Sequence, residues 1–150
     1  MQFKLATIAT TLFAASAIAA PTPAASKSAM ADVEQWTIEG VKRVCDAADT
    51  SCTWSFGVNT HQGAAAATPC TFTVKGSPAS QTDSAGNVCG PYTVGSGWSG
   101  QFGPGNGFTT LSVVDQAAKL IVWPSYTDKE LAGGKVVTPD LSFAPTVINF

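Results

Sequence analysis

Residues that could carry out acyl transfer are few in this chain, and they do not form a recognisable set. His61 is the single histidine, and a hydrolase would need it beside a nucleophile and an orienting carboxylate. Ser99 lies in the string G-W-S-G-Q, which is one glycine short of the G-x-S-x-G nucleophile elbow. We therefore interpret His61 as a solvated loop side chain and predict no catalytic residue.

Carboxylates offer a second kind of chemistry, because a glycoside hydrolase needs two of them facing each other across a cleft. The candidates by position are Asp115, Asp128, Glu130 and Asp140. All four fall in segments that we expect to be turns, and turns lie on the surface where acids are solvated. A small hydrolase or an inhibitor is therefore only the third-ranked hypothesis.

Aromatic side chains could instead bind a sugar by stacking. The candidates are Trp54, Tyr92, Trp98, Trp123 and Tyr126. Trp54 alternates in phase with Cys52 and Phe56, which places it in the core. Trp98 lies in a glycine-rich stretch and, with Phe102, is the candidate for an exposed contact. Packing of Trp98 and Phe102 that pins this stretch to the core is the favoured interpretation.

The glycine-rich stretch contains the string G-x-G-x-x-G from Gly95 to Gly100. That string binds a dinucleotide only at a strand-to-helix turn, where helix N–H groups meet the pyrophosphate. Here glycines continue to Gly107, Pro104 lies among them, and no helical pattern follows. We predict a surface loop over Gly95–Gly107 and no cofactor.

Four cysteines predict two disulfides in a secreted chain, with three pairings open: the residues are Cys45, Cys52, Cys70 and Cys89. We favour Cys45–Cys52 and Cys70–Cys89, because sequential pairing closes short connections between neighbouring strands. The spacings are not C-x2-C and there is a single histidine, so we predict no zinc or other metal site.

Short β-strands must position these residues. Cys52 to Val58 and Cys70 to Lys75 both alternate apolar and polar side chains, which predicts two central strands with one buried face each. Residues 32–39 predict a first strand, which continues to Cys45 past a bulge at Gly40. Phe108–Val114 and Lys119–Trp123 predict a β-hairpin around a turn at residues 115–118.

The remaining segments are expected to be loops and short elements. We expect a surface loop over Gly76–Asn87 and an edge strand over Val88–Val94 that is interrupted at Gly90-Pro91. Ser125–Ala132 predicts a turn or short helix capped by Thr127 or Asp128, and Lys135–Val137 predicts a last strand. About seven short strands indicate an all-β fold, a small antiparallel β-sandwich or barrel tied by two disulfides.

The N-terminus predicts secretion. Residues 1–19 have the basic start, apolar run and small-residue cleavage site of a signal peptide, and 20–31 form a flexible lead-in. Residues 32–150 are expected to be a single β domain with a loosely ordered C-terminal tail. After cleavage seven basic residues face ten acidic ones, without a basic cluster, so we expect no nucleic-acid partner. No segment is long enough to span a membrane, and we expect an extracellular monomer.

A family resemblance rests on strings spread over almost the whole mature chain. They are W-T-I at Trp36, R-x-C at Arg43, C-T-W-S-F at Cys52, C-T-F-x-V at Cys70, C-G-P at Cys89, W-S-G-Q-F at Trp98, F-T-T-L-S-V-V-D at Phe108 and I-V-W-P-x-Y-T-D-K at Ile121. These strings resemble a group of small secreted proteins of filamentous ascomycetes, which are candidate effectors or surface proteins. A more distant likeness is to the Alternaria major-allergen β-barrel family, from which the Cys45–Cys52 spacing departs.

The resemblance implies a non-enzymatic fungal effector or elicitor that acts in virulence by surface contact. The alternative is a cell-wall or carbohydrate-binding module that uses exposed aromatics. The partner would accordingly be a host protein or a cell-wall polysaccharide. The working surface is expected in the loops at Gly76–Asn87 and Gly95–Gly107, where variation disturbs the core least.

Overall fold

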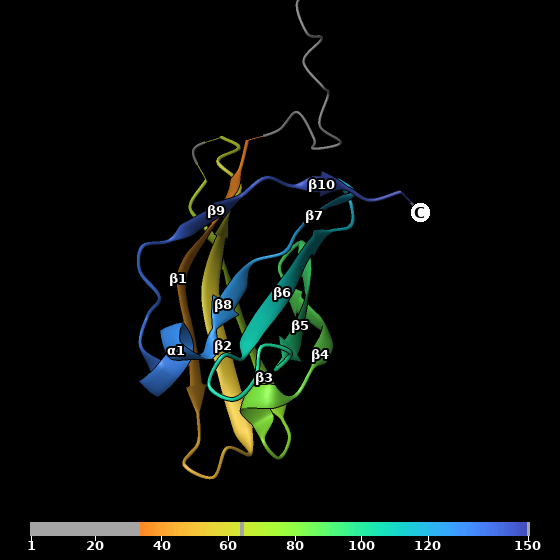
Figure 1. The fold of residues 1–150 in the computed structure, drawn as a ribbon. Coiled ribbons are helices and arrows are strands. Elements are labelled where there is room, and N and C mark those ends of the chain that lie inside the picture. Colours follow the sequence, from red (N-terminus) through yellow and green to blue (C-terminus); the bar gives the residue numbers. More distant parts are fainter. Residues whose placement is uncertain (1–33, 64, 150) are drawn as a thin grey trace, which may run out of the picture.

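A computed structural model describes residues 34–63 and 65–149, and it folds into two antiparallel sheets (Figure 1). The expected signal peptide and lead-in lie outside the described residues. A sandwich and a barrel were the two predicted alternatives. The sheets do not close on each other, so the structure is a sandwich. The all-β prediction is confirmed.

The first sheet has four strands in the order β3-β2-β1-β9. Their bounds are β1 (Trp36–Cys45), β2 (Ser51–Asn59), β3 (Thr68–Lys75) and β9 (Leu141–Phe143). In β2 the predicted alternation holds along the whole strand, and its buried side chains are Cys52, Trp54, Phe56 and Val58. The central strand therefore builds the core.

A bulge at Gly40 divides β1. The register with β2 shifts between Glu39 and Lys42, and Gly40 has a φ of 59°, which glycine adopts without steric cost. Before the bulge Trp36 and Ile38 are buried, whereas after it Val41 and Arg43 are buried. The extra residue thus changes which side chains of the strand face inward, and it brings a charged residue into the interior.

The second sheet has six strands. Five follow the order β10-β7-β6-β5-β4, and β8 also pairs with β6. Their bounds are β4 (Ser84–Cys89), β5 (Tyr92–Ser99), β6 (Phe108–Asp115), β7 (Leu120–Val122), β8 (Ser125–Thr127) and β10 (Thr146–Val147). β6 and β7 form the predicted hairpin, in which Val113 lies opposite Val122.

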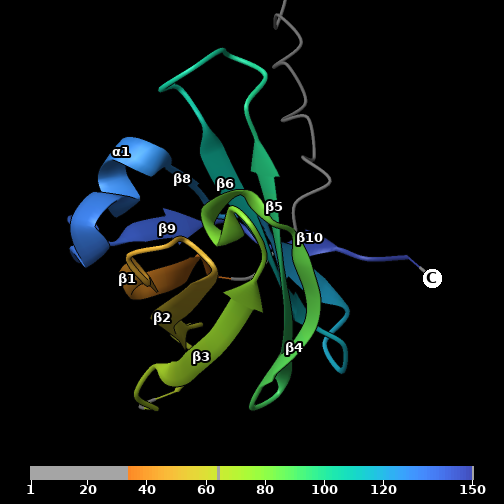
Figure 2. The same ribbon diagram turned by 90° about the horizontal axis from the view of Figure 1, so that it is seen from below.

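The core lies between the two sheets, which Figure 2 shows end-on with β1–β3 on one side and β4–β6 on the other. The rings of Trp36 and Tyr92 meet edge-to-face across it, with centroids 5.6 Å apart. Cys70 of β3 and Cys89 of β4 form a disulfide between the sheets. Cys45 and Cys52 are opposite each other on β1 and β2 and form the other disulfide, so the pairing is the favoured one.

Two expected loops are shorter than the sequence suggested. Gly95–Ser99 belong to β5, so only residues 100–107 form a loop, and the G-x-G-x-x-G string begins inside a strand. Ser84–Asn87 belong to β4, and Gly90-Pro91 forms a hairpin turn between β4 and β5 rather than an interruption. The expectation failed because glycine has low strand propensity by itself, whereas β5 is paired on both sides.

The C-terminal third also differs from expectation. Residues 125–127 form β8, which precedes α1 (Asp128–Leu131) and a short 3-10 turn, η2 (Ala132–Gly134). Residues 135–137 are not a strand, although the Val137 amide donates to the Val41 carbonyl at 2.7 Å. Residues 141–147, expected in a loosely ordered tail, supply a strand to each sheet (β9 and β10), which gives ten strands in the described part of the chain.

Candidate functional site

Both segments that were expected to carry the working surface meet at one end of the sandwich. The short 3-10 turn η1 (Ala79–Gln81), the end of β5, the 100–107 loop and the start of α1 surround a hollow of about 300 Å³. Its lining residues are Gln81, Trp98, Gly100, Gly103, Pro104, Gly105, Gly107 and Asp128. We call this region the loop end.

Arg43 is the charged residue behind the loop end, and it is only 7% exposed. One of its terminal nitrogens donates to the Ser80 carbonyl at 3.0 Å and to the Thr109 hydroxyl at 3.4 Å, and the other donates to Asp128 at 3.1 Å. Its guanidinium carbon lies 5.5 Å from the centre of the Trp54 ring. Burial of a charge is costly unless it is paired and hydrogen-bonded, and Arg43 meets both conditions.

Asp128 connects Arg43 to Trp98. One carboxylate oxygen accepts from Arg43, and the other accepts from the indole N–H of Trp98 at 2.9 Å. Asp128 is the first residue of α1, and its backbone amide donates to the Gly107 carbonyl at 2.9 Å. The carboxylate that could have served a glycosidase is therefore occupied in holding the loop end together.

Trp98 is half-buried, and its indole ring lies close to the backbone of two glycines, Gly100 and Gly107. A Cβ atom at Gly100 would lie 2.5 Å from the indole ring, and one at Gly107 would lie 2.9 Å from it, so larger residues at either position would collide with the ring. Its N–H is occupied by Asp128. These contacts fit the packing role that was favoured for Trp98.

Phe102 differs from Trp98, because its side chain is 66% exposed and does not pin the loop to the core. It rests against Phe108, with ring centroids 5.7 Å apart. Phe102, Phe108 and Tyr126 line a second hollow, of about 250 Å³, which no charged residue lines. The loop that carries Phe102 is held by backbone hydrogen bonds from Gly103 to Gly100 and from Asn106 to Gly103.

The remaining candidate catalytic groups have local structural contacts. The His61 ring is 2.7 Å from the Thr37 hydroxyl, Asp115 accepts from the Ala118 amide in the β6–β7 turn, and Asp140 accepts from the Gly40 amide. Glu130 forms the capping box of α1 together with the N-cap residue Thr127. Among the hydrogen bonds of the described residues, none joins two of these groups.

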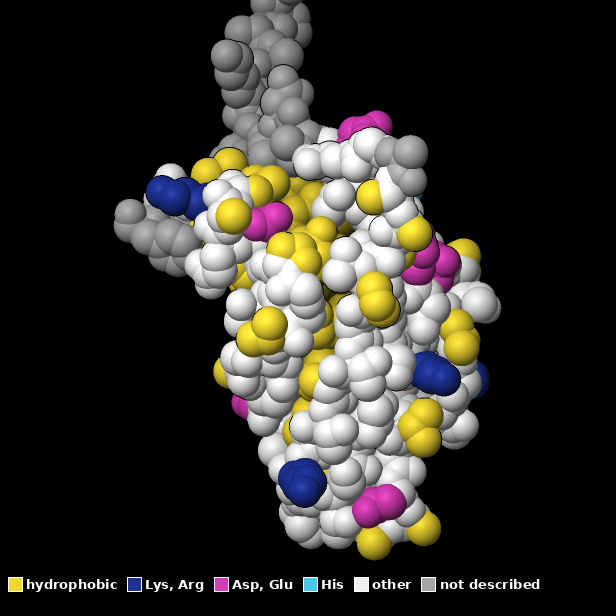
Figure 3. All heavy atoms as spheres, turned by 180° about the vertical axis from the view of Figure 1, so that it is seen from behind, with side chains coloured by type: hydrophobic (Ala, Val, Ile, Leu, Met, Phe, Trp, Pro, Cys, Tyr) yellow, Lys and Arg dark blue, Asp and Glu magenta, His cyan; other side chains and the backbone are white. Residues whose placement is uncertain are grey.

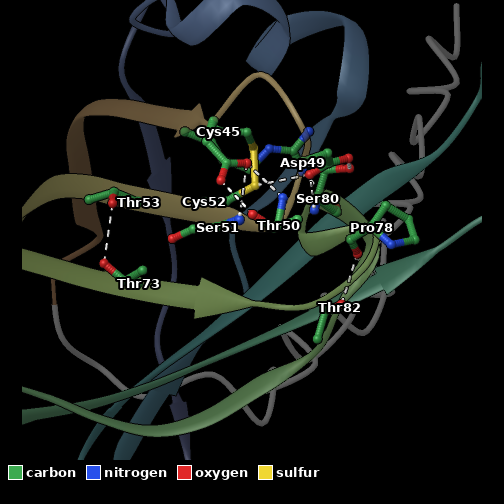
Figure 4. The surroundings of a disulfide bond; sticks show 12 residues. Cys45, Asp49, Thr50, Ser51, Cys52, Thr53, Thr73, Pro78, Ser80 and Thr82 are labelled. Carbon is green, nitrogen blue, oxygen red and sulfur yellow. Dashed lines mark hydrogen bonds between the residues drawn. A yellow bond between two sulfur atoms is a disulfide. The ribbon is translucent and has the colours of Figure 1, made fainter.

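Three potential metal ligands lie close together at Cys45, Asp49 and Cys52. The two sulfur atoms are joined in a disulfide, whereas a metal needs thiolates. Asp49 is turned toward Ser80, from which it accepts both the amide and the hydroxyl hydrogen (Figure 4). The cluster thus fastens η1 to the β1–β2 turn.

Two residues that matter in the structure were not predicted from the sequence. Arg43 was not singled out, because only its distant partners reveal that it is buried. Trp123 was named only as one of five aromatic candidates for sugar stacking, and its exposure was not predicted. Its side chain is 52% exposed. A local signal for Trp123 exists, because it continues the alternation of β7, in which Leu120 and Val122 are buried.

The surface gives no sign of a basic footprint on the face shown in Figure 3, where Lys and Arg side chains lie apart from each other. Hydrophobic side chains gather in the upper part of that face and lie more scattered toward its lower end. In the part of the chain that the structure describes, no helix combines the length and the apolar character needed to cross a membrane.

The fold and the loop end define a small β-sandwich with two disulfides, whose accessible features are an exposed aromatic loop and shallow hollows. The family model described as Effector TSP1 matches residues 37–149. The chain is also 60% identical over 141 residues to Effector TSP1 of Hypocrea virens (strain Gv29-8 / FGSC 10586), which covers 93% of this chain and 94% of that protein. The chain therefore belongs to the Effector TSP1 family.

Membership confirms the resemblance to fungal proteins of the effector type, and it makes this chain a candidate fungal effector. The family and the two disulfides also support a secreted protein, since disulfides persist in oxidising compartments.

Proposed function

We propose that this protein is a non-enzymatic effector that acts by surface contact with a host protein, and that Phe102 is the centre of the contact. The observation that carries the proposal is the 66% exposure of Phe102 on a loop held in place by its own hydrogen bonds. An exposed aromatic side chain loses contact with water when a partner covers it, and buried aromatics dominate many protein interfaces.

The surroundings of Phe102 suit an apolar partner side chain. The hollow of about 250 Å³ beside it is lined by Phe108, Tyr126 and uncharged polar residues. The Arg43–Asp128–Trp98 contacts hold the loop end from behind, so little conformational entropy would be lost when a partner binds.

Substitution of Phe102 tests this function. Purified wild-type protein and Phe102→Ser are applied to host tissue, and the immune response and the urea unfolding midpoint are measured for both. We expect Phe102→Ser to abolish the response with an unchanged unfolding midpoint, because an exposed side chain contributes little to folding. Val88→Ser is the matched control, since Val88 is 77% exposed on β4, and it should keep both properties.

Two results would refute the proposal. One is a full immune response to Phe102→Ser. The other is a fungal deletion strain that colonises its host and triggers immunity as the parent strain does.

A further inference from the structure

The outer face of the six-stranded sheet carries a trough of about 370 Å³. This face is turned away from β1–β3 (Figure 2). The floor is formed by Gly95 and Gly97 of β5 and by Thr110 and Ser112 of β6, and Trp123 forms one side.

The trough exists because β5 has glycines where side chains would otherwise stand. Gly95 lies opposite Ser112, and Gly97 lies opposite Thr110. A Cβ atom at Gly97 would meet nothing within 4 Å, so the space above it is open. At Gly95 the Ser84 carbonyl is 3.2 Å from the Cβ position, so the bulged strand β4 forms the opposite side.

Trp123 presents its indole to this trough. Val122 before it and Pro124 after it are buried, whereas Trp123 is 52% exposed. Trp123 directly follows β7, and two strand spacings, or about 10 Å, separate β7 from β5. A half-exposed tryptophan beside an open floor is a large apolar surface that a ligand could cover.

The chemistry of the lining indicates the ligand class. No charged residue lines the trough, which disfavours nucleic acids and acidic polysaccharides as ligands. Ser112 and Thr110 supply hydroxyls. The Thr110 hydroxyl already contacts Ser125 at 2.6 Å, but a hydroxyl has one donor and two acceptor positions and can bond again.

We propose that this trough binds a neutral polysaccharide, with the Trp123 indole stacked on a pyranose ring and the Thr110 and Ser112 hydroxyls bonded to sugar hydroxyls. A pyranose has an apolar face and a polar rim, and it therefore matches an aromatic platform beside uncharged donors and acceptors. The site is separate from Phe102 and does not depend on the proposed function.

Retention on insoluble β-1,3-glucan, cellulose and chitin tests the site. Wild-type protein should be retained on at least one of the three, and Trp123→Ala should weaken binding about tenfold, as expected for loss of an aromatic stacking contact. Trp123→Phe should restore part of the affinity. Gly97→Val places a β-branched side chain in the open space, so it should weaken binding while the strand is maintained.

Phe102→Ala is the control for a general effect of exposed aromatics, and its retention should equal that of the wild type. The site is refuted if the wild-type protein is retained on none of the three polymers. It is also refuted if Trp123→Ala binds as well as wild type, or if Phe102→Ala weakens binding as much. Phe102→Ser measured in host tissue tests the effector contact separately, so the two proposals can fail independently.

Discussion

Arg43 shows how a single buried charge can organise one end of a small sandwich. Its partners come from η1, β6 and α1, which are far apart in the sequence. Asp128 shares its carboxylate between Arg43 and Trp98, so the position of the glycine-rich loop depends on Arg43 through one intermediate residue. The same contacts thus join η1, β6 and α1 and also hold the glycine-rich loop that carries Phe102.

Replacement of Arg43 by methionine should destabilise the protein. The variant leaves Asp128 and the Ser80 carbonyl without their donor, which we expect to cost about 1–3 kcal/mol, below the range for fully buried pairs because Asp128 is partly exposed. Urea unfolding measures the loss, and Lys42→Met on the same strand should change stability by less than about 0.5 kcal/mol. An equal effect of the two substitutions would contradict this role.

At the scale of elements, the four-residue helix α1 depends on its cap. The Thr127 hydroxyl accepts from the Glu130 amide at 3.2 Å, and the Glu130 carboxylate accepts from the Thr127 amide at 2.7 Å. This reciprocal capping box was expected in part, since Thr127 was one of the two predicted caps. The cap fixes the turn on which Asp128 lies, and through it the contact to Arg43.

The cap should make stability depend on pH in the acid range. The hydrogen bonds from the Thr127 amide and hydroxyl lower the pKa of Glu130. A lowered pKa gives stability that is complete above the unfolded value, about 4.3, and that is lost as the pH falls through the folded value. We expect Glu130→Gln to flatten the fall in urea stability between about pH 5 and pH 3, because glutamine also completes a capping box.

Glu34→Gln removes the same charge at an exposed position and is the control for that series. Its stability should fall with acid as that of the wild type does. Some acid dependence should persist in Glu130→Gln, because hydrogen bonds from Thr50 lower the pKa of Asp46 as well. If the stability of Glu130→Gln fell with acid as steeply as that of the wild type, the cap would be excluded as a source of the pH dependence.

At the scale of the whole molecule, the two disulfides have different tasks. Cys45–Cys52 closes the β1–β2 hairpin inside one sheet (Figure 4), whereas Cys70–Cys89 joins β3 to β4 across the sandwich. The sequence separations are 7 and 19 residues. Since a longer closed loop restricts the unfolded chain more, the bond between the sheets should stabilise the fold more.

Paired substitutions test this difference. Cys70→Ala with Cys89→Ala should lower the free energy of unfolding by about 3 kcal/mol, and Cys45→Ala with Cys52→Ala by about 2 kcal/mol. Urea unfolding without reductant measures both, and peptide mapping of the unreduced wild type checks the pairing. A larger loss from the Cys45–Cys52 pair, or a bond between Cys45 and Cys70, would contradict the expectation.

Local pattern alone determined the strands whose side chains alternate. Cys52 to Val58 and Cys70 to Lys75 predicted their own buried faces, because a period of two is a property of the strand itself. The cap at Thr127 and the bulge at Gly40 were also predictable from neighbouring residues. The short spacings between successive cysteines favoured the disulfide pairing found here.

Tertiary structure decided the features that depend on distant partners. Gly95 and Gly97 have little strand propensity, and they lie in β5 because β4 and β6 pair with it on both sides. β9 is three residues long and exists because it pairs with β1, about a hundred residues earlier. Arg43 is buried because Asp128 and Ser80 satisfy its charge, and no local pattern of residues encodes contacts of that sequence separation.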